Sequence, residues 1–271
     1  MSKVVLITGC SSGIGRDLAQ RLTVAGYNVV ATARKIESLN DLQAALKLPL
    51  DVTQPESVIQ AIGRTIQQFG RIDVLVNNAG YTVYGAVEEI TDGQVRQIFE
   101  TNVFGVLRMV REVAPHMRRQ GSGRIINISS IFGKLPFPVN GVYSSTKFAI
   151  EALSDALRLE MADLGVKVVL IEPAAVKSSF GENAQSHTQG TLSNPASPYR
   201  VLYQNFEQMA ASMHQQGSEP GTVSKVVRQA IEATRPKARY RVGVGFSGRL
   251  VMWLGDSAWD FALRRMLKIA S

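Results

Sequence analysis

Cysteine is almost absent from this chain of 271 residues, which contains Cys10 alone. A single cysteine cannot form a disulfide within the chain, so the sequence carries no disulfide framework. Hydrophobic residues make up 45% of the sequence and charged residues 19%, which is typical of a folded globular protein and excludes an intrinsically disordered one. The length allows one α/β domain or two small ones.

Long apolar runs are also absent. No stretch approaches the roughly 18 apolar residues that a membrane-spanning helix needs. The apolar residues from Val4 to Ile7 are too few for the core of a signal peptide, and they lead directly into a glycine-containing loop. We therefore interpret them as the first strand of the fold, and we expect a cytoplasmic protein without a transmembrane span.

The formal net charge is +8, yet the lysines and arginines form no long run and accompany no nucleic-acid-binding motif. A positive field favours anionic ligands such as a dinucleotide phosphate. We interpret the charge as a generally basic surface, and we expect no nucleic-acid partner and no bound metal.

Short apolar runs alternate along the chain with longer segments of helical periodicity. The runs Val4–Ile7, Val74–Val76 and Val168–Ile171 lack polar alternation, which is typical of strands buried on both faces of a parallel sheet. The repeated strand-then-helix order predicts an α/β fold, a Rossmann-like doubly wound parallel sheet of about seven strands with helices on both faces. The expected strands are 3–8, 27–33, 46–51, 72–77, 123–129, 166–172 and 240–245, and the expected helices are 13–25, 55–69, 93–119, 143–164 and 222–234, with a weaker one at 36–45.

No internal repeat or linker divides the chain, so we expect residues 1–271 to form one domain with two unusual segments. Residues 178–221 are rich in Ser, Gln, Asn and Pro and then carry the apolar side chains of Tyr199, Leu202, Tyr203, Phe206, Met209 and Met213. A long segment of this kind is usually a functional lid or a disordered insertion, and we interpret it as a substrate lid. The C-terminal extension 246–271 mixes large apolar with basic side chains. It can lie on a membrane surface or dock on the lid or a partner subunit, and we favour docking.

A glycine-containing loop follows the first expected strand and opens the first expected helix. Its sequence from Thr8 to Gly15 is TGCSSGIG. Glycine lets the backbone turn sharply and approach a pyrophosphate, and the helix N-terminus supplies N–H groups and a partial positive charge. The position between strand and helix favours a dinucleotide site. The loop residues expected to bind the cofactor are Gly9, Ser11, Ser12, Gly13, Ile14 and Gly15.

Five ordered motifs together resemble the short-chain dehydrogenase/reductase family. They are the TGxxxGIG loop, Asn77-Asn78-Ala79-Gly80, Asn102, Ser130, and Tyr143-Ser144-Ser145-Thr146-Lys147. The resemblance extends from about residue 3 to about residue 180, with a plausible last helix and strand beyond. The glycine loop and the stretch Leu135–Leu153 look like the branch that contains 17β-hydroxysteroid and retinol dehydrogenases.

The end of the second expected strand bears on which nicotinamide cofactor is used. A carboxylate there binds the ribose hydroxyls of NAD, whereas a nearby arginine accepts the 2′-phosphate of NADP. Ala33 occupies the acidic slot of the family and Arg34 follows it, so we expect NADP(H). The resemblance further implies that Asp51 and Val52 hold the adenine and that Asn78, Ala79 and Gly80 pass close to its ribose.

Tyr143 and Lys147 are four residues apart on an expected helix and therefore share one face. A cation beside a tyrosine lowers its pKa, which would let Tyr143 accept a proton from an alcohol or donate one to a carbonyl. In the family, the lysine also grips the ribose hydroxyls of the cofactor, and an asparagine, here Asn102, holds a water beside the lysine. Ser130 matches the catalytic serine that orients the substrate oxygen. Ser129 competes for that role, and because strand alternation points the two side chains apart, we choose Ser130.

The chain departs from the family pattern after the sixth expected strand. The family has Pro-Gly and then a threonine that binds the carboxamide, whereas this chain has Pro173-Ala174 and then Ser178. Ser178 keeps the hydroxyl, and Ala174 alters the backbone that meets the nicotinamide. The resemblance implies cofactor contacts from Pro173, Val176 and Ser178.

We expect an NADP(H)-dependent oxidoreductase that transfers a hydride between the nicotinamide and an apolar carbonyl or alcohol. The stretch Leu135–Val139 and the apolar lid favour a large apolar substrate, and steroids, retinoids, long-chain aldehydes and aromatic ketones all remain open. The alternative is a nucleotide-sensing regulator without catalysis, which would not need Ser130, Tyr143, Lys147 and Asn102. An isomerase or dehydratase on the same fold is a further alternative. Family members pair the helices that correspond to 93–119 and 143–164, which implies a homodimer or homotetramer.

Overall fold

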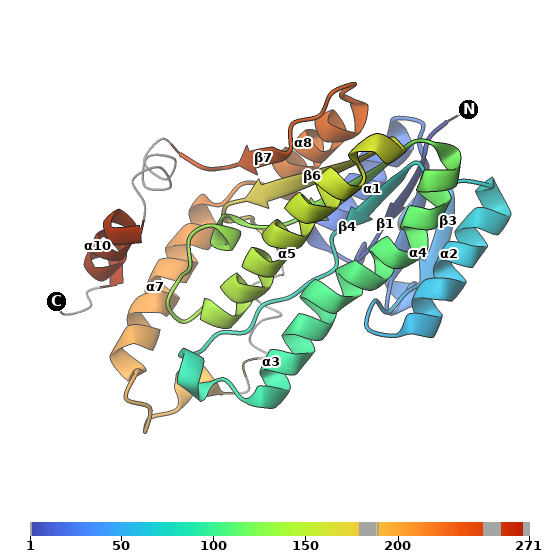
Figure 1. The fold of residues 1–271 in the computed structure, drawn as a ribbon. Coiled ribbons are helices and arrows are strands. Elements are labelled where there is room, and N and C mark those ends of the chain that lie inside the picture. The colour runs from blue at the N-terminus through green and yellow to red at the C-terminus, as the bar shows by residue number, and fades with distance from the viewer. Residues whose placement is uncertain (1, 179–187, 189, 246–255, 268–271) are drawn as a thin grey trace.

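The computed structural model describes residues 2–178, 188, 190–245 and 256–267. Within these residues, seven strands form one parallel sheet in the order β3-β2-β1-β4-β5-β6-β7, with helices on both faces (Figure 1). This arrangement confirms the predicted doubly wound fold. The strands are β1 Val4–Ile7, β2 Asn28–Ala33, β3 Leu46–Pro49, β4 Val74–Asn77, β5 Gly123–Ile128, β6 Val166–Pro173 and β7 Arg239–Val242.

The central strands are apolar throughout because both of their faces are covered. In β1, Val5 and Ile7 belong to the core on one face of the sheet, whereas Val4 and Leu6 belong to the core on the other face. All four side chains are at most 1% exposed. The absence of polar alternation in these strands therefore follows from burial on two sides.

Two layers of helices cover the sheet. Side chains of α1 (Gly13–Val24) and α8 (Pro220–Glu232) fill the core on one face. Side chains of α2 (Pro55–Phe69) and α4 (Gly105–Gln120) fill the core on the other, and α5 (Gly141–Glu160) packs beside them along β6. The strand order reverses between β1 and β4, and in doubly wound sheets ligands bind at such a point.

The helix expected over 93–119 forms without a break, but one turn within it is π-helical rather than α-helical. The α3 helix (Asp92–Phe99) begins with a capping box between Thr91 and Gln94. A π-helical stretch, Glu100–Phe104, then links α3 to α4. Such a turn inserts one extra residue per turn and frequently occurs at a functional site. Asn102 lies within it.

Two predicted elements are shorter than expected. Of the helix expected over 36–45, only the 3₁₀ turn η1 (Ile36–Leu39) forms. The reason is that the chain turns there to bury Leu39 and Leu42, while Arg16 of α1 holds the Ser38 carbonyl and the Asp41 carboxylate. The last strand ends at Val242 rather than at 245, because Gly243 has a φ of +73°, which is incompatible with a β-strand.

The expected lid segment contains a long helix, α7 (Arg200–Gln216), after a short 3₁₀ turn, η6 (Thr191–Ser193). The C-terminal helix α10 (Asp256–Leu267) packs against α7 beyond the carboxyl ends of the strands (Figure 1). Asn205 Nδ2 donates a hydrogen bond to the Leu267 carbonyl oxygen, 2.9 Å away, and Leu263 and Leu267 are buried against Phe206 and its neighbours. The extension therefore docks on the expected lid, although residues 246–255 and 268–271 of it lie outside the described residues.

None of the helices that the structure describes is long and apolar enough to cross a bilayer. This agrees with the absence of long apolar runs in the sequence.

Candidate active site

A cavity of about 1380 Å³ opens at the carboxyl edge of the sheet. Residues that directly follow β1, β2, β4, β5 and β6 line it, together with residues of α5 and α7. The cavity brings together every residue that the sequence proposed for the site except Gly15 and Asn102: Gly9, Ser11, Ser12, Gly13, Ile14, Arg34, Asp51, Val52, Asn78, Ala79, Gly80, Ser130, Tyr143, Lys147, Pro173, Val176 and Ser178.

The glycine loop between β1 and α1 has no room for side chains at two of its glycines. A Cβ atom on Gly9, where φ is +73°, would lie 2.9 Å from the Ala79 Cα atom. A Cβ atom on Gly15 would lie 2.3 Å from the Gly9 carbonyl oxygen. Gly15 therefore stays outside the cavity and allows the loop to fold tightly beneath it.

The part of this loop at the N-terminus of α1 is suited to binding an anion. Ser11, Ser12, Gly13 and Ile14 line the cavity at the N-terminus of α1, and the first turn of that helix contains no acidic residue. Backbone N–H groups and the helix dipole favour a phosphate at such a position. The loop therefore fits the pyrophosphate of a dinucleotide.

Asn78 fastens the end of β4 to the glycine loop. Its Nδ2 atom donates hydrogen bonds to the carbonyl oxygens of Thr8 and Gly9, at 2.9 and 3.0 Å. The Thr8 hydroxyl in turn accepts hydrogen bonds from the backbone N–H groups of Asn78 and Ala79, both at 3.0 Å. These four bonds fix the floor of the cavity where an adenine ribose would lie.

The end of β2 presents a cation and no carboxylate to the cavity. Ala33 is buried, and Arg34 is exposed at the cavity wall. Within the described residues, no acidic side chain forms a salt bridge with Arg34, whereas Arg16 is paired with Asp41. The Arg34 guanidinium is therefore available for a phosphate group.

Asp51 lines the cavity two residues beyond the end of β3, the strand next to β2. Its Oδ1 atom accepts hydrogen bonds from the backbone N–H and the hydroxyl of Thr53, at 2.9 and 2.8 Å. Val52 beside it is buried, and its side chain lies so close to Gly105 of α4 that a Cβ atom there would be 2.7 Å from Val52 Cγ2. Both residues line the cavity, as the resemblance implies for an adenine site.

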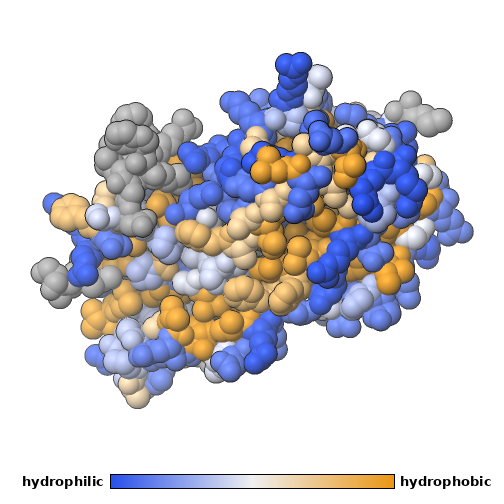
Figure 2. Space-filling model, in the orientation of Figure 1, coloured by the Kyte–Doolittle hydropathy of each residue, from blue (hydrophilic) through white to orange (hydrophobic). Residues whose placement is uncertain are grey.

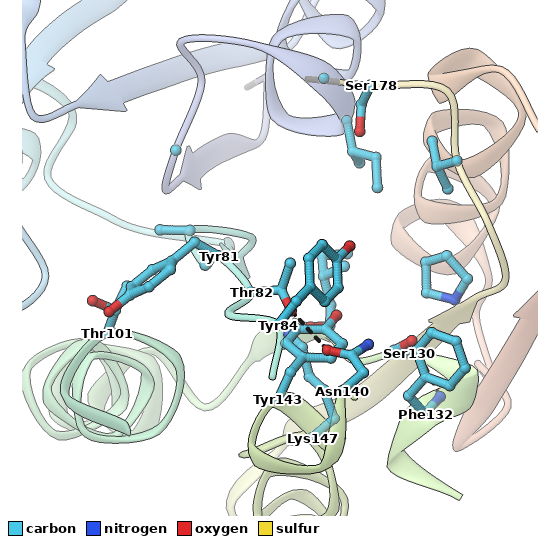
Figure 3. A pocket seen from close by; sticks show the side chains of 18 of the residues that line it. Tyr81, Thr82, Tyr84, Thr101, Ser130, Phe132, Asn140, Tyr143, Lys147 and Ser178 are labelled. Carbon is cyan, nitrogen blue, oxygen red and sulfur yellow. Dashed lines mark hydrogen bonds between the residues drawn. The ribbon is translucent and has the colours of Figure 1, made fainter. Parts of the chain in front are cut away.

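Ser130 and Tyr143 both line the cavity, from the end of β5 and from α5 (Figure 3). The Ser130 hydroxyl acts on the Tyr143 phenol by lowering its pKa, and the Ser130 oxygen accepts a hydrogen bond from the Phe132 backbone N–H at 3.2 Å. Ser129 also borders the cavity, because β5 ends at Ile128 and strict alternation stops there. The Ser129 hydroxyl is fully buried without a hydrogen-bond partner. The geometry favours Ser130 over Ser129 as the partner of the tyrosine.

Burial sets the protonation of the tyrosine and the lysine. Tyr143 is 7% exposed, and burial raises its pKa above the ordinary value of 10, while the Ser130 hydrogen bond opposes that shift. Burial also lowers the pKa of Lys147 to about 8, and the nearby Glu151 carboxylate opposes that change. The net direction is therefore opposite to the lowering expected from the lysine, because burial is the largest influence on the pKa of Tyr143. The phenol is protonated at neutral pH.

Lys147 is held beneath the tyrosine. Its Nζ atom donates a hydrogen bond to the Ile128 carbonyl oxygen at 2.9 Å and lies 5.6 Å from the centroid of the Tyr143 ring. The ammonium is thereby oriented by the last residue of β5, and among the residues that the structure describes it donates no other hydrogen bond. This placement is compatible with the ribose contact that the resemblance implies.

Asn102 does not line the cavity. Its Oδ1 atom accepts a hydrogen bond from the Tyr81 backbone N–H at 3.1 Å, and its Nδ2 atom donates to the Tyr81 carbonyl oxygen at 2.9 Å. Nδ2 also lies 3.2 Å from the Thr146 hydroxyl. Asn102, in the π-helical stretch, therefore connects Tyr81, which follows β4, with Thr146 of α5. Thr146 directly precedes Lys147.

The segment after β6 closes the cavity over the glycine loop. Hydrogen bonds with Ser218 hold Ala175 and Lys177 in place, at 2.9 Å each. The side chain of Ser178 faces the loop so closely that a Cβ atom on Gly13 would lie 3.3 Å from Ser178 Cβ. Ala174 is accommodated beside Gly243 and donates its backbone N–H to the Val242 carbonyl oxygen. The alanine that replaces the family glycine thus fits the local packing.

Aromatic and apolar side chains form the outer part of the cavity. Of the six apolar residues that the sequence assigned to the lid, only Phe206 and Met213 line it. Tyr203 is instead a fully buried support, whose hydroxyl accepts from the Ala86 N–H at 2.9 Å and pairs with Glu89. Tyr199, Leu202 and Met209 pack behind the cavity wall. The helical period explains this division, since only one face of α7 can meet the cavity.

Sequence reasoning missed many polar residues of the cavity, among them Thr82, Tyr84 and Asn140. Thr82 and Tyr84 follow β4 in a segment without regular structure, where no periodicity indicates orientation. Asn140 lies at the N-cap position of α5, outside the helix expected over 143–164, and no spacing in the sequence indicates that it lines the cavity. No signal in the sequence shows that these side chains converge.

The sequence matches one family model and is similar to two named enzymes over most of its length. The profile of the short chain dehydrogenase family matches residues 3–189. A 3-ketodihydrosphingosine reductase of Bacteroides thetaiotaomicron is 35% identical over 266 residues, which cover 97% of this chain and 97% of that protein. Estradiol 17-beta-dehydrogenase 1 of Rattus norvegicus is 35% identical over 253 residues, which cover 88% of this chain and 73% of the relative.

Solved structures share the fold over nearly the same span. A short-chain dehydrogenase from Streptomyces avermitilis superposes with a TM-score of 0.79 at 34% identity, covering 99% of this chain and 97% of the other. A short chain dehydrogenase/reductase from Burkholderia phymatum in complex with NAD has a TM-score of 0.75 at 26% identity, covering 88% of each chain. The protein ElxO with NADP bound has a TM-score of 0.73 at 28% identity, covering 89% of this chain and 97% of ElxO.

Proposed function

The chain belongs to the short-chain dehydrogenase family of oxidoreductases, and from that membership we propose that it reduces an apolar ketone or aldehyde with NADPH. The observation that carries the proposal is that Ser130, Tyr143 and Lys147 line one cavity with the glycine loop, with the Lys147 ammonium 5.6 Å from the Tyr143 ring centroid. The reverse reaction, oxidation of the corresponding alcohol, uses the same groups.

In this proposal, Tyr143 is the proton donor. When bound, NADPH supplies a hydride to the carbonyl carbon of the substrate. Tyr143 donates its phenolic proton to the carbonyl oxygen, and Ser130 orients that oxygen by a hydrogen bond. The raised pKa of Tyr143 supports the direction of reduction, because the phenol holds its proton at neutral pH. Lys147 would hold the ribose hydroxyls, and its ammonium would offset the negative charge of the phenolate that remains once the proton has left.

Asn102 acts through the backbone in this proposal. Its two hydrogen bonds to Tyr81 and its contact with Thr146 keep the chain after β4 in register with α5. The water beside the lysine that the family resemblance implies would have to lie next to this junction. We assign Asn102 to the positioning of Lys147 and of that water.

The proposed cofactor preference is NADP(H) over NAD(H). Its support is the exposed Arg34 at the cavity wall and the buried Ala33 where an acid would bind the ribose of NAD. Structural relatives carry either cofactor, NAD in the Burkholderia phymatum protein and NADP in ElxO. The choice in this chain therefore depends on its own residues at the end of β2.

The proposed substrate is large and mostly apolar. Phe132, Phe137, Phe206 and Met213 provide the outer wall of the cavity. Two relatives, a 3-ketodihydrosphingosine reductase and an estradiol 17-beta-dehydrogenase, have names that denote lipid-like substrates. We also propose that α7 and the segment around it act as the substrate lid of a single domain.

A homodimer or homotetramer completes the proposal, together with a cytoplasmic location. Large apolar side chains are exposed on the π-helical stretch and on α5, where Phe104 is 47%, Phe148 is 42% and Leu159 is 69% exposed. Figure 2 shows hydrophobic side chains gathered over the middle of the face that α4 and α5 occupy in Figure 1. Monomers rarely expose a contiguous apolar patch of this kind, whereas a two-fold interface buries it.

The direct test is cofactor turnover. A panel of steroid, retinoid and long-chain ketones and aldehydes is offered with NADPH, and the loss of reduced-cofactor absorbance is followed. We expect turnover with bulky apolar carbonyls. A protein that binds NADPH tightly but oxidises it with no member of the panel would instead support the nucleotide-sensing alternative.

A further inference from the structure

The proposed reaction needs two side chains from different elements to keep a fixed relative position. Ser130 follows β5 and orients the substrate oxygen, whereas Tyr143 lies in the first turn of α5 and donates the proton (Figure 3). A displacement of about 1 Å in a reacting group can lower the rate on the order of 100-fold. The contacts that hold the chain around Ser130 against α5 therefore bear directly on catalysis.

A short turn connects Ser130 with Lys134. The 3₁₀ turn η4 (Ile131–Gly133) follows Ser130 directly. The Gly133 N–H donates a hydrogen bond to the Ser130 carbonyl oxygen at 2.9 Å, and the Lys134 N–H donates one to the Ile131 carbonyl oxygen at 3.0 Å. Because each bond closes a loop of only three residues, the turn is held as a unit, and a displacement of Lys134 is transmitted to Ser130.

This turn packs on α5 without space for a side chain between them. A Cβ atom on Gly133 would lie 3.0 Å from Glu151 Cγ and 3.1 Å from the Lys147 carbonyl oxygen. It would also lie 3.0 Å from the Ser129 hydroxyl oxygen. These distances are shorter than ordinary van der Waals contacts, so only glycine fits here without displacing its neighbours. The turn consequently rests on α5 at the helical turn between Lys147 and Glu151.

Glu151 is the charged group at this contact. Its side chain is 4% exposed, and its Oε2 atom lies 3.2 Å from Lys134 Nζ and 2.9 Å from Arg239 Nε. Arg239 belongs to β7 and also pairs with Glu172 of β6, whose Oε1 atom is 3.1 Å from the Arg239 Nε atom. A buried carboxylate requires cationic partners. Arg239 therefore fixes Glu151 to the sheet, and Lys134 is the cation that attaches the turn to Glu151.

We infer that the ion pair of Lys134 and Glu151 positions Ser130 relative to Tyr143. Lys134 and Glu151 are both outside the set of residues that line the cavity, so they are positioning residues that act through Ser130. The inference rests on the proposed function, because the position of Ser130 affects the rate only if Ser130 orients a substrate oxygen. It predicts that an ion pair outside the cavity controls the chemical step without controlling cofactor affinity.

Replacement of the lysine tests this role. Lys134→Met removes the ammonium but keeps an unbranched apolar side chain, and Lys134 is 34% exposed, so the variant should fold. With a carbonyl that the wild type reduces, kcat should fall about 10-fold, while the dissociation constant for NADPH, measured by fluorescence titration, should change little. Lys134→Arg keeps the charge and should recover most of the wild-type kcat. An unchanged kcat in folded Lys134→Met overturns the inference and leaves the proposed reductase standing, whereas a wild type that reduces no carbonyl overturns both.

A double-mutant cycle tests whether the lysine acts through Ser130. Lys134→Met is combined with Ser130→Ala, and the residual kcat is measured at high enzyme concentration. If Lys134 only positions the serine, its replacement should have little further effect once the Ser130 hydroxyl is gone. A loss that is equally large in the presence and absence of that hydroxyl shows a general structural role and overturns the inference.

Two further variants separate the turn from the rest of the ion network. Asp155→Asn is the matched control, because Asp155 also pairs with Arg239, at 2.5 Å, and its other ion pair is with Arg158 rather than with the turn. It should lower the thermal midpoint but retain the wild-type kcat. Gly133→Ala should displace the turn from α5 and lower kcat as Lys134→Met does, again with little change in NADPH affinity. A loss of kcat in Asp155→Asn as large as that in Lys134→Met would reject the specific role of the turn.

Discussion

The ammonium of Lys147 lies 5.6 Å from the centroid of the Tyr143 ring, one turn further along α5. The two groups respond to burial in opposite ways. The phenol becomes harder to ionise, whereas the pKa of Lys147 falls to about 8. Each shift favours the neutral form, so the protonation of this pair near neutral pH depends on the lysine rather than on the tyrosine.

The pH profile of the reaction should therefore show the titration of Lys147. Lys147 is charged below pH 8 and becomes neutral above it. In the proposed mechanism the ammonium holds the cofactor ribose and stabilises the phenolate left after proton transfer, so kcat/KM for carbonyl reduction should fall as the pH rises through about 8. The pKa of Tyr143 is shifted upwards, so the tyrosine does not cause this limb. The measurement is the initial rate of NADPH oxidation from about pH 6 to about pH 10, roughly two pH units on either side of the lysine pKa of about 8.

The control for this profile is Lys147→Arg. An arginine keeps its charge over the whole range. Its maximal rate should be lower because the guanidinium does not fit the ammonium site, but the decline near pH 8 should disappear. A decline that persists unchanged in the arginine variant would assign the titration to another group.

The pattern of the sheet and of the glycine loop could be predicted from sequence, because both depend on local order. Apolar runs without alternation identify buried parallel strands, and the TGCSSGIG loop identifies the turn from β1 into α1. The Tyr143 and Lys147 pair follows from helical spacing. Each of these features involves residues within a few positions of one another.

The features that sequence could not predict depend on tertiary environment. Desolvation reverses the expected pKa shift of Tyr143, and no local pattern measures desolvation. The Asn140 side chain leaves its helix for Thr82, which is 58 residues away in the chain. Only a 3₁₀ turn forms where a helix was expected over 36–45, because the chain turns there to bury Leu39 and Leu42. The division of the α7 side chains between cavity and core likewise depends on which face of the helix meets Phe137.

Replacement of the proton donor should abolish turnover without affecting cofactor binding. Tyr143→Phe keeps the ring in its buried position but removes the hydroxyl that Ser130 contacts. We expect kcat to fall by a factor of roughly 100 or more, because general acid catalysis is lost. The dissociation constant for NADPH, measured by fluorescence titration, should change little. Ser129→Ala is the matched control and should retain turnover, so near-normal activity in Tyr143→Phe or a large loss in Ser129→Ala would refute the assignment.

The cofactor preference should change with two substitutions at the end of β2. Arg34→Ala removes the guanidinium at the cavity wall and should weaken NADPH about 10-fold or more relative to NADH, which is the contribution of a charge-assisted pair with phosphate. Ala33→Asp introduces the missing carboxylate and should further favour NADH by repelling the 2′-phosphate. Direct titration of both cofactors measures these effects. An equal loss for both cofactors in Arg34→Ala, or a wild-type preference for NADH, would contradict the proposed specificity.

The apolar face of α5 should determine the oligomeric state. Phe148 is 42% exposed and follows Lys147 directly, on the outer side of the helix. Phe148→Glu places a charge in the proposed two-fold interface, where its desolvation is unfavourable. Light scattering should give at least twice the chain mass of 29.5 kDa for the wild type and a smaller species for the variant. Val24→Glu is a suitable control, because Val24 is 86% exposed at the end of α1 on the other face of the sheet. A wild-type monomer would argue against the interface.

The α7 helix allows its two proposed roles to be separated, because neighbouring apolar residues face different surroundings. Phe206 lines the cavity and contacts the rings of Tyr84 and Phe137, with centroids 5.0 and 6.2 Å away. Met209 belongs to the same apolar cluster but does not line the cavity. Phe206→Ala should therefore change the ranking of bulky apolar ketones by kcat/KM, whereas Met209→Ala should leave that ranking unchanged.

Both substitutions remove buried apolar surface, so both should lower the thermal midpoint. Phe206→Ala should lower the free energy of unfolding by about 3 kcal/mol, and Met209→Ala, at a partly buried position, should lower it by about 1–2 kcal/mol. Stability alone therefore cannot distinguish a lid from a scaffold, but the substrate ranking can. Phe206→Leu is a milder second variant that should shift the ranking in the same direction with less destabilisation. If the Phe206 variants alter only the thermal midpoint and the order of substrates stays fixed, then α7 supports the fold, and the substrate must be recognised by the other walls of the cavity.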